Sequence, residues 1–146
     1  MKKILLLSAF SIFSLLSFAQ IEVSMDEMRS DWKLIKQENG VEVYISAMEC
    51  TMGNVKEPFL YGSVKVVNTT SEVKNISFTY ELFYTDGCSG CGATDEYSKF
   101  IRIEGNSTSE GDCEFTKPES TILLVNPLQT EMTELNKLVI NDFKIK

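Results

Sequence analysis

Apolar and polar residues alternate along most of the chain, in short runs separated by turn residues. The run 73–84 is the longest, and every second residue from Ile76 to Tyr84 is apolar or aromatic. The run 41–50 alternates in the same way. Because successive side chains of a strand point to opposite faces, this period of two predicts half-buried β-strands.

Turn residues divide the other apolar runs into further expected strands. Asn39-Gly40 predicts a tight hairpin between the runs 32–37 and 41–50, because both residues tolerate positive φ. A second turn is expected at 68–71. The remaining expected strands are 59–67, 97–104, 109–115, 122–125 and 138–145, with 97–104 and 109–115 joined as a hairpin around Gly105-Asn106.

Seven or eight short strands, with turns about every 8 to 12 residues, are typical of an all-β, antiparallel sandwich of immunoglobulin or fibronectin type III kind. A small β-barrel is the second interpretation. Two helical stretches are expected, and both are too short to change the fold class. One follows the capping box Ser24-x-x-Glu27, and the other starts at Asn126-Pro127 with Leu128, Met132 and Leu135.

The N-terminus has the features of an export signal. Lys2 and Lys3 precede an apolar stretch, and Ser17-Phe18-Ala19 is a small-x-small cleavage site. The apolar stretch is shorter than the roughly 20 residues of a membrane-spanning helix. A bacterial lipoprotein needs a cysteine at the cleavage point, and the first cysteine is Cys50, so no lipid anchor is expected. We therefore expect a signal peptide at 1–19, an N-terminal extension at 20–31 and one domain at 32–146, exported to the periplasm or outside the cell.

The strand order places all four cysteines at one end of the expected sandwich. If neighbouring strands run up and down, then Cys50, Cys88, Cys91 and Cys113 lie together. In an oxidising compartment four cysteines most simply form two disulfides, in one of three pairings. A Cys50–Cys113 bridge would contribute roughly 4 kcal/mol and Cys88–Cys91 roughly 2 kcal/mol by loop-closure entropy. We expect these two pairs, although the crossed pairings stay open.

Two sharper interpretations of the cysteines compete with structural disulfides. Cys88-Ser89-Gly90-Cys91 has the spacing of thiol–disulfide oxidoreductases, but no helix follows and nearby acids would raise a thiol pKa. A site with four thiolate ligands would suit zinc, although there is one C-x-x-C and no histidine. Thiol redox chemistry or metal binding is thus the alternative function.

Composition argues against catalysis and against nucleic acid. The chain has no histidine, which removes the commonest general base and a common metal ligand. It has no nucleophile elbow and no phosphate-binding loop. Loss of Lys2 and Lys3 with the signal makes the formal net charge of −7 two units more negative. Such a surface repels phosphate backbones, so we expect neither an enzyme nor a nucleic-acid partner.

Acidic and aromatic residues give weaker signals. Carboxylates expected near the cysteines would suit a calcium ion, but a solvated acidic loop explains them as well, because no EF-hand spacing is present. The weak metal candidates are Asp86, Asp95, Glu96 and Asp112, with Glu49 and Glu114 nearby. Aromatic residues on the expected outer faces would form cross-strand pairs or a sugar or protein contact. They are Tyr44, Phe59, Tyr61 and Phe83.

Several short segments together resemble small exported proteins of Bacteroidetes-type bacteria. The resemblance extends over nearly all of the mature chain, implies export and a sandwich fold, and carries over no functional residue. Its segments are Trp32, Asn39-Gly40-Val41-Glu42-Val43-Tyr44, Glu49-Cys50, Val66-Val67-Asn68-Thr69-Thr70, Tyr80-Glu81-Leu82-Phe83-Tyr84, Cys88-x-x-Cys91, Glu110-Gly111-Asp112-Cys113 and Lys137-Leu138-x-Ile140. We expect no cofactor.

The leading functional hypothesis is a non-catalytic, exported module that binds a protein or a glycan through loops on a rigid scaffold. Inhibition of a cationic hydrolase such as lysozyme is a special case that rests on charge complementarity. The ligand and the oligomeric state are left open by the sequence.

Overall fold

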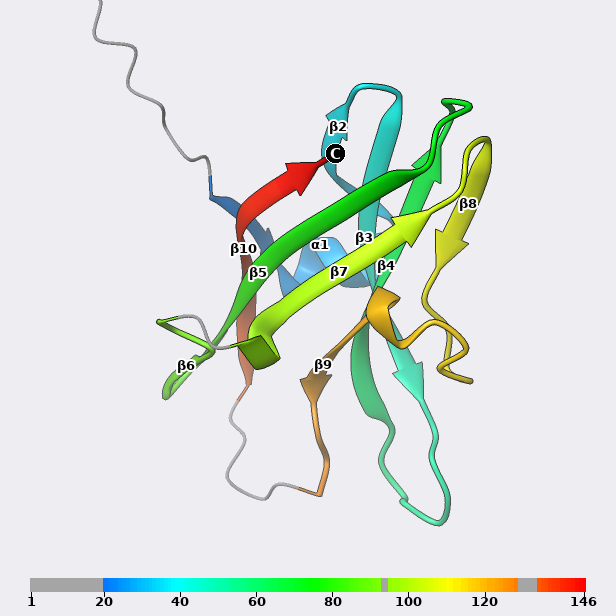
Figure 1. The fold of residues 1–146 in the computed structure, drawn as a ribbon. Coiled ribbons are helices and arrows are strands. Elements are labelled where there is room, and N and C mark those ends of the chain that lie inside the picture. The colour runs from blue at the N-terminus through cyan, green and yellow to red at the C-terminus, as the bar shows by residue number, and fades with distance from the viewer. Residues whose placement is uncertain (1–19, 93–94, 129–133) are drawn as a thin grey trace, which may run out of the picture.

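The computed structural model describes residues 20–92, 95–128 and 134–146 of the chain. In these residues the strands form two antiparallel sheets, named sheet A and sheet B below (Figure 1). The chain is mostly β, as the alternating pattern predicted, and its two separate sheets do not form a single closed barrel.

Sheet A is built around its longest strands, β5 and β10. β10 pairs with β1 on one edge and β5 on the other, while β6 and β7 share the far edge of β5. β6 lies beside the end of β5 near Tyr84, and β7 lies beside the end near Lys74. The strands are β1 (Ile21–Ser24), β5 (Lys74–Tyr84), β6 (Gly87–Ser89), β7 (Ser98–Ile103) and β10 (Leu135–Ile145).

Sheet B is built around β3 and β4. β2 and β3 form the predicted hairpin, in which Asn39 and Gly40 both have positive φ. β8 and β9 both pair with β4, beyond β3. The strands are β2 (Lys33–Glu38), β3 (Val41–Cys50), β4 (Phe59–Asn68), β8 (Ser107–Glu110) and β9 (Thr121–Val125). The helical elements are α1 (Met25–Ser30), η1 (Asp95–Tyr97) and η2 (Pro118–Ser120).

Side chains from both sheets form one hydrophobic core, so the sheets pack face to face as a sandwich. The alternation predicted for the two longest runs is confirmed. The buried side chains of those runs are Val41, Val43 and Ile45 in β3 and Ile76, Phe78, Tyr80 and Leu82 in β5.

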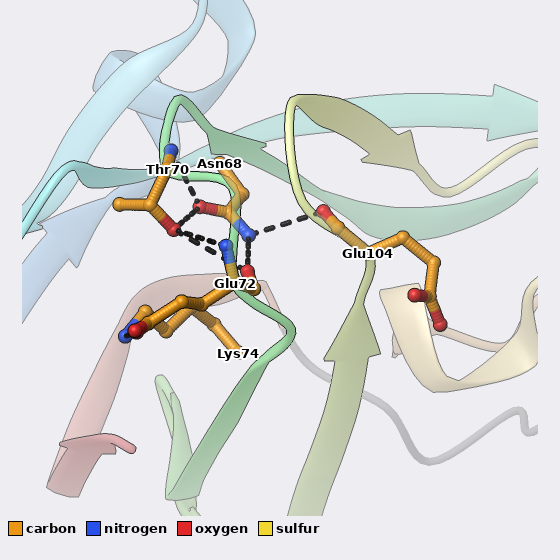
Figure 2. A network of polar contacts seen from close by, with 5 residues as sticks. All are labelled: Asn68, Thr70, Glu72, Lys74 and Glu104. Atoms are coloured by element: carbon orange, nitrogen blue, oxygen red, sulfur yellow. Dashed lines mark hydrogen bonds and ion pairs between the residues drawn. The ribbon is translucent and has the colours of Figure 1, made fainter.

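Asn68 joins two connections in which the chain passes from one sheet to the other. Its side chain is 1% exposed. Its amide nitrogen donates to the carbonyl oxygens of Glu72, at 2.8 Å, and Glu104, at 3.0 Å. Its amide oxygen accepts from the backbone N–H and the hydroxyl of Thr70 (Figure 2). One residue therefore holds the β4–β5 and β7–β8 connections together.

The predicted hairpin of strands 97–104 and 109–115 is wrong. β7 pairs with β5 in sheet A, whereas β8 pairs with β4 in sheet B. The later strand also ends early, at Glu110. After it, Gly111 passes so close to η2 that a Cβ atom there would lie 2.2 Å from the carbonyl oxygen of Ser120. Residues 111–117 accordingly leave sheet B as a loop.

The segment 20–31, which we expected as an extension, is packed into the sandwich. β1 pairs with β10, and both Val23 and Met28 are fully buried. The predicted capping box starts α1, because the Ser24 hydroxyl accepts from the N–H of Glu27 and the Glu27 carboxylate accepts from the N–H of Ser24.

Two other boundaries differ from the sequence prediction. β10 begins at Leu135, three residues earlier than expected. Of the helical stretch expected after Asn126, residues 127 and 128 form a turn. Met132 lies outside the described residues.

Candidate functional site

The cysteines pair as Cys50–Cys113 and Cys88–Cys91, with Cα–Cα distances of 5.4 Å and 5.8 Å. These are the two pairs that we expected among the three possible pairings. The four cysteines do not form one site. The first bridge ties the end of β3 to the loop after β8 in sheet B, and the second lies at the edge of sheet A. β6 and β8 lie on opposite sides of the molecule (Figure 1).

The Cys50–Cys113 bridge belongs to a second, small apolar cluster on the outer face of sheet B. Cys50 is 1% exposed and packs with Phe59 and Tyr61. The ring of Phe115, from the loop that carries Cys113, meets Tyr61 edge to face at 4.9 Å. Burial raises the pKa of Tyr61. Phe59 and Tyr61 are therefore packing residues of this cluster and do not offer a sugar or protein contact.

The Cys88–Cys91 loop is held against Tyr97. The Ser89 and Tyr97 hydroxyls are 2.6 Å apart. A Cβ atom on Gly90 would lie 2.3 Å from the Tyr97 ring, so glycine lets this loop approach the ring closely. Both cysteines are exposed, and no cysteine of the chain is a free thiol. Residues 95–97, which follow, form only a single turn of 3₁₀ helix.

The acidic metal candidates are not brought together. Among the described residues, no group of three or more cysteine, aspartate or glutamate side chains could hold a metal ion. The Asp112 carboxylate instead accepts from the N–H and hydroxyl of Thr116, and these bonds lower its pKa. Asp86 lies just before β6, Asp95 and Glu96 lie in η1, and Asp112 lies in the loop after β8.

Two half-buried aromatic residues, Trp32 just before β2 and Tyr44 in β3, lie on either side of one lysine of sheet B. The ammonium of Lys65 lies 4.0 Å from the centre of the Trp32 ring and 5.1 Å from that of Tyr44. The Tyr44 hydroxyl donates to Glu42 at 2.7 Å, and this bond raises the pKa of Tyr44. These polar groups are satisfied within the chain.

The outer face of sheet A carries a trough with a volume of about 500 Å³. Its shape follows from the strand register. Ser77 in β5 lies between Phe100 in β7 and Lys144 in β10, and Thr79, next along the same face of β5, lies opposite Ser98. Small side chains on a central strand with long side chains on both neighbours produce a groove along that strand.

An irregularity in β10 forms one wall of the trough. The pairing of β10 with β5 shifts between Asn141 and Lys144. At this bulge Phe143 stacks on the buried Phe78, with ring centres 5.4 Å apart, while Asp142 has a φ of 51° and stays exposed. Bulges of this kind re-aim side chains and are common beside functional sites. Here the bulge places Asp142 and Lys144 together on the trough.

The trough presents an exposed aromatic ring beside polar groups without partners. Phe100 is 61% exposed, the largest fraction among the exposed aromatic residues that the structure describes. Among the polar residues that line the trough, Lys99 donates to the carbonyl oxygen of Pro118, and in the same described part of the chain no side-chain hydrogen bond or ion pair engages the other five. These groups are Ser77, Thr79, Ser98, Asp142 and Lys144.

Our sequence predictions did not include Phe100. The sequence pattern nevertheless places Phe100 on the outer face. Ile101 and Ile103 form the buried face of this strand, so the alternation of side chains turns Phe100 outward. What the sequence does not show is which strands flank β5, and without this the trough cannot be predicted.

Comparison with models of protein families, with curated proteins and with solved structures finds no match to the chain. None of the helices in the described part of the chain has the length and apolarity to span a membrane.

Proposed function

We propose that the chain is an exported, non-catalytic binding module whose ligand site is the trough on the outer face of sheet A. The observation that supports this most strongly is Phe100, which is 61% exposed beside five unpartnered polar side chains. An exposed aromatic residue with polar neighbours in a hollow is a common feature of binding sites.

The rest of the molecule supports a rigid scaffold of immunoglobulin or fibronectin type III kind. Two antiparallel sheets share one core, and two disulfides restrain the connections. Disulfides form and persist in oxidising compartments, which agrees with the export expected from residues 1–19. A binding site on strands of such a scaffold is preorganised and loses little entropy when a ligand binds.

A pair of variants tests the proposal. Phe100→Ala removes the exposed ring, and Leu34→Ala removes a 43% exposed side chain from sheet B as a matched control. Both variants and the parent chain, without its signal, are screened on immobilised glycans and against envelope proteins of the source cell. We expect at least one ligand that the parent and Leu34→Ala retain and Phe100→Ala loses. If all three chains bind every ligand equally well, the trough is not the binding site.

Thiol redox chemistry is the second candidate, favoured by the exposure of both Cys88 and Cys91. The relevant measurement is the reduction potential of this pair in glutathione buffers. A potential well above roughly −300 mV would support redox function, and a lower one would support a structural bridge.

A further inference from the structure

The trough has one apolar wall and otherwise polar surroundings. Phe100 offers the apolar surface, and the hydroxyls of Ser77, Thr79 and Ser98 lie beside it. Hydroxyls both donate and accept hydrogen bonds, whereas Asp142 only accepts and Lys144 only donates. A complementary ligand therefore has a flat apolar face and several groups that both donate and accept hydrogen bonds.

A peptide fits this trough less well than such a ligand. Peptides that bind sheets usually add a strand to an open edge, where main-chain hydrogen bonds supply affinity. The trough instead follows β5, whose two edges are already paired with β10 and β7 along residues 76–79. A ligand here meets side chains only, and a single exposed ring is a small anchor for a peptide.

Charge argues against an anionic ligand. The two charged groups that face the ligand, Asp142 and Lys144, have opposite signs. Lys99 is the third charged residue that lines the trough, and its ammonium donates to the carbonyl oxygen of Pro118 at 3.4 Å. The whole chain has a formal net charge of −7, which repels acidic polymers.

We propose that the trough binds a neutral carbohydrate. This inference rests on the proposed function and names its ligand. The C–H face of one sugar ring packs on Phe100, whose ring face is electron-rich, and the sugar hydroxyls bond to Ser77, Thr79, Asp142 and Lys144. A sugar ring is the ligand that combines an apolar face with many hydroxyls.

The experiment is affinity electrophoresis in native gels that contain a neutral β-glucan, xylan or mannan, beside gels with anionic pectate or alginate. We expect at least one neutral polymer to retard the parent chain. Phe100→Ala should bind it at least about tenfold more weakly, and Thr79→Val about two- to tenfold more weakly. Phe100→Tyr, which keeps an aromatic face, and Leu34→Ala should bind as the parent does. Circular dichroism of each variant confirms that it is folded.

The outcomes separate this inference from the proposed function. If only anionic polymers retard the chain, or if Phe100→Ala binds the neutral polymer as the parent does, the carbohydrate inference is wrong. If the chain binds no polymer but binds a purified protein in a manner that requires Phe100, the trough is a binding site and the carbohydrate inference alone fails. If no ligand of either kind requires Phe100, both fail.

Discussion

Asn68 shows how one buried amide can fix the path of the chain between two sheets. Replacing it with alanine removes the amide donor that the carbonyl oxygens of Glu72 and Glu104 share, although each keeps a hydroxyl donor, from Thr70 and Ser107 respectively. We expect Asn68→Ala to reduce the free energy of unfolding by roughly 1 to 3 kcal/mol, as typical for loss of a hydrogen-bonded side chain. Urea denaturation measures the change. Asn54→Ala, in an exposed loop, is the control and should change little; equal losses would contradict this role.

Gly90 and Gly92 allow a second test at single positions. Both have positive φ, 83° and 94°, so alanine at either costs roughly 1 to 2 kcal/mol in backbone strain. Only at Gly90 would the added methyl also meet the Tyr97 ring, because nothing lies within 4 Å of a Cβ at Gly92. Thermal unfolding should therefore show a larger loss for Gly90→Ala than for Gly92→Ala. The reverse order would mean that the loop does not pack on Tyr97.

At the scale of elements, α1 gives a pH-dependent prediction. Hydrogen bonds from Lys33 and then from the Ser24 backbone and hydroxyl lower the pKa of Glu27 from 4.5 to about 2. Because the folded pKa is depressed, this stabilisation is present above pH 4.5 and is lost as the pH falls toward 2. Urea unfolding midpoints measured between pH 5 and pH 2.5 should fall less steeply for Glu27→Gln than for the parent chain.

Asp26→Asn, in the same helical turn but outside the capping box, is the control and should keep the slope of the parent chain. An unchanged slope in Glu27→Gln would contradict the lowered pKa of Glu27.

The elements show which features the sequence could predict. The capping box at Ser24, the Asn39-Gly40 hairpin and the alternation of β5 depend on neighbouring residues, and all three were predicted. The partners of β7 and β8 depend on contacts distant in sequence, so the expected hairpin around Gly105 was wrong. The trough was missed for the same reason, because it needs the order β10-β5-β7.

At the scale of the whole molecule, the two disulfides should differ in their effect on stability. Cys50–Cys113 closes a loop of sequence separation 63, and Cys88–Cys91 one of separation 3. Loop-closure entropy assigns them roughly 4 and 2 kcal/mol. The double replacement Cys50→Ser with Cys113→Ser should therefore lower the melting temperature well below that of Cys88→Ser with Cys91→Ser. Calorimetry on both proteins checks the order, and equal melting temperatures would contradict it.

The central claim is that the chain binds its ligand on the outer face of sheet A. The most direct measurement is an NMR titration of the ¹⁵N-labelled chain with a mixture of neutral oligosaccharides. We predict amide shift changes confined to the trough, at Ser77, Thr79, Ser98, Phe100 and Lys144. An absence of shift changes at millimolar sugar would contradict the carbohydrate inference alone. Changes centred on Tyr44 of sheet B and the neighbouring Trp32, or on the Cys88–Cys91 loop, would contradict the claim.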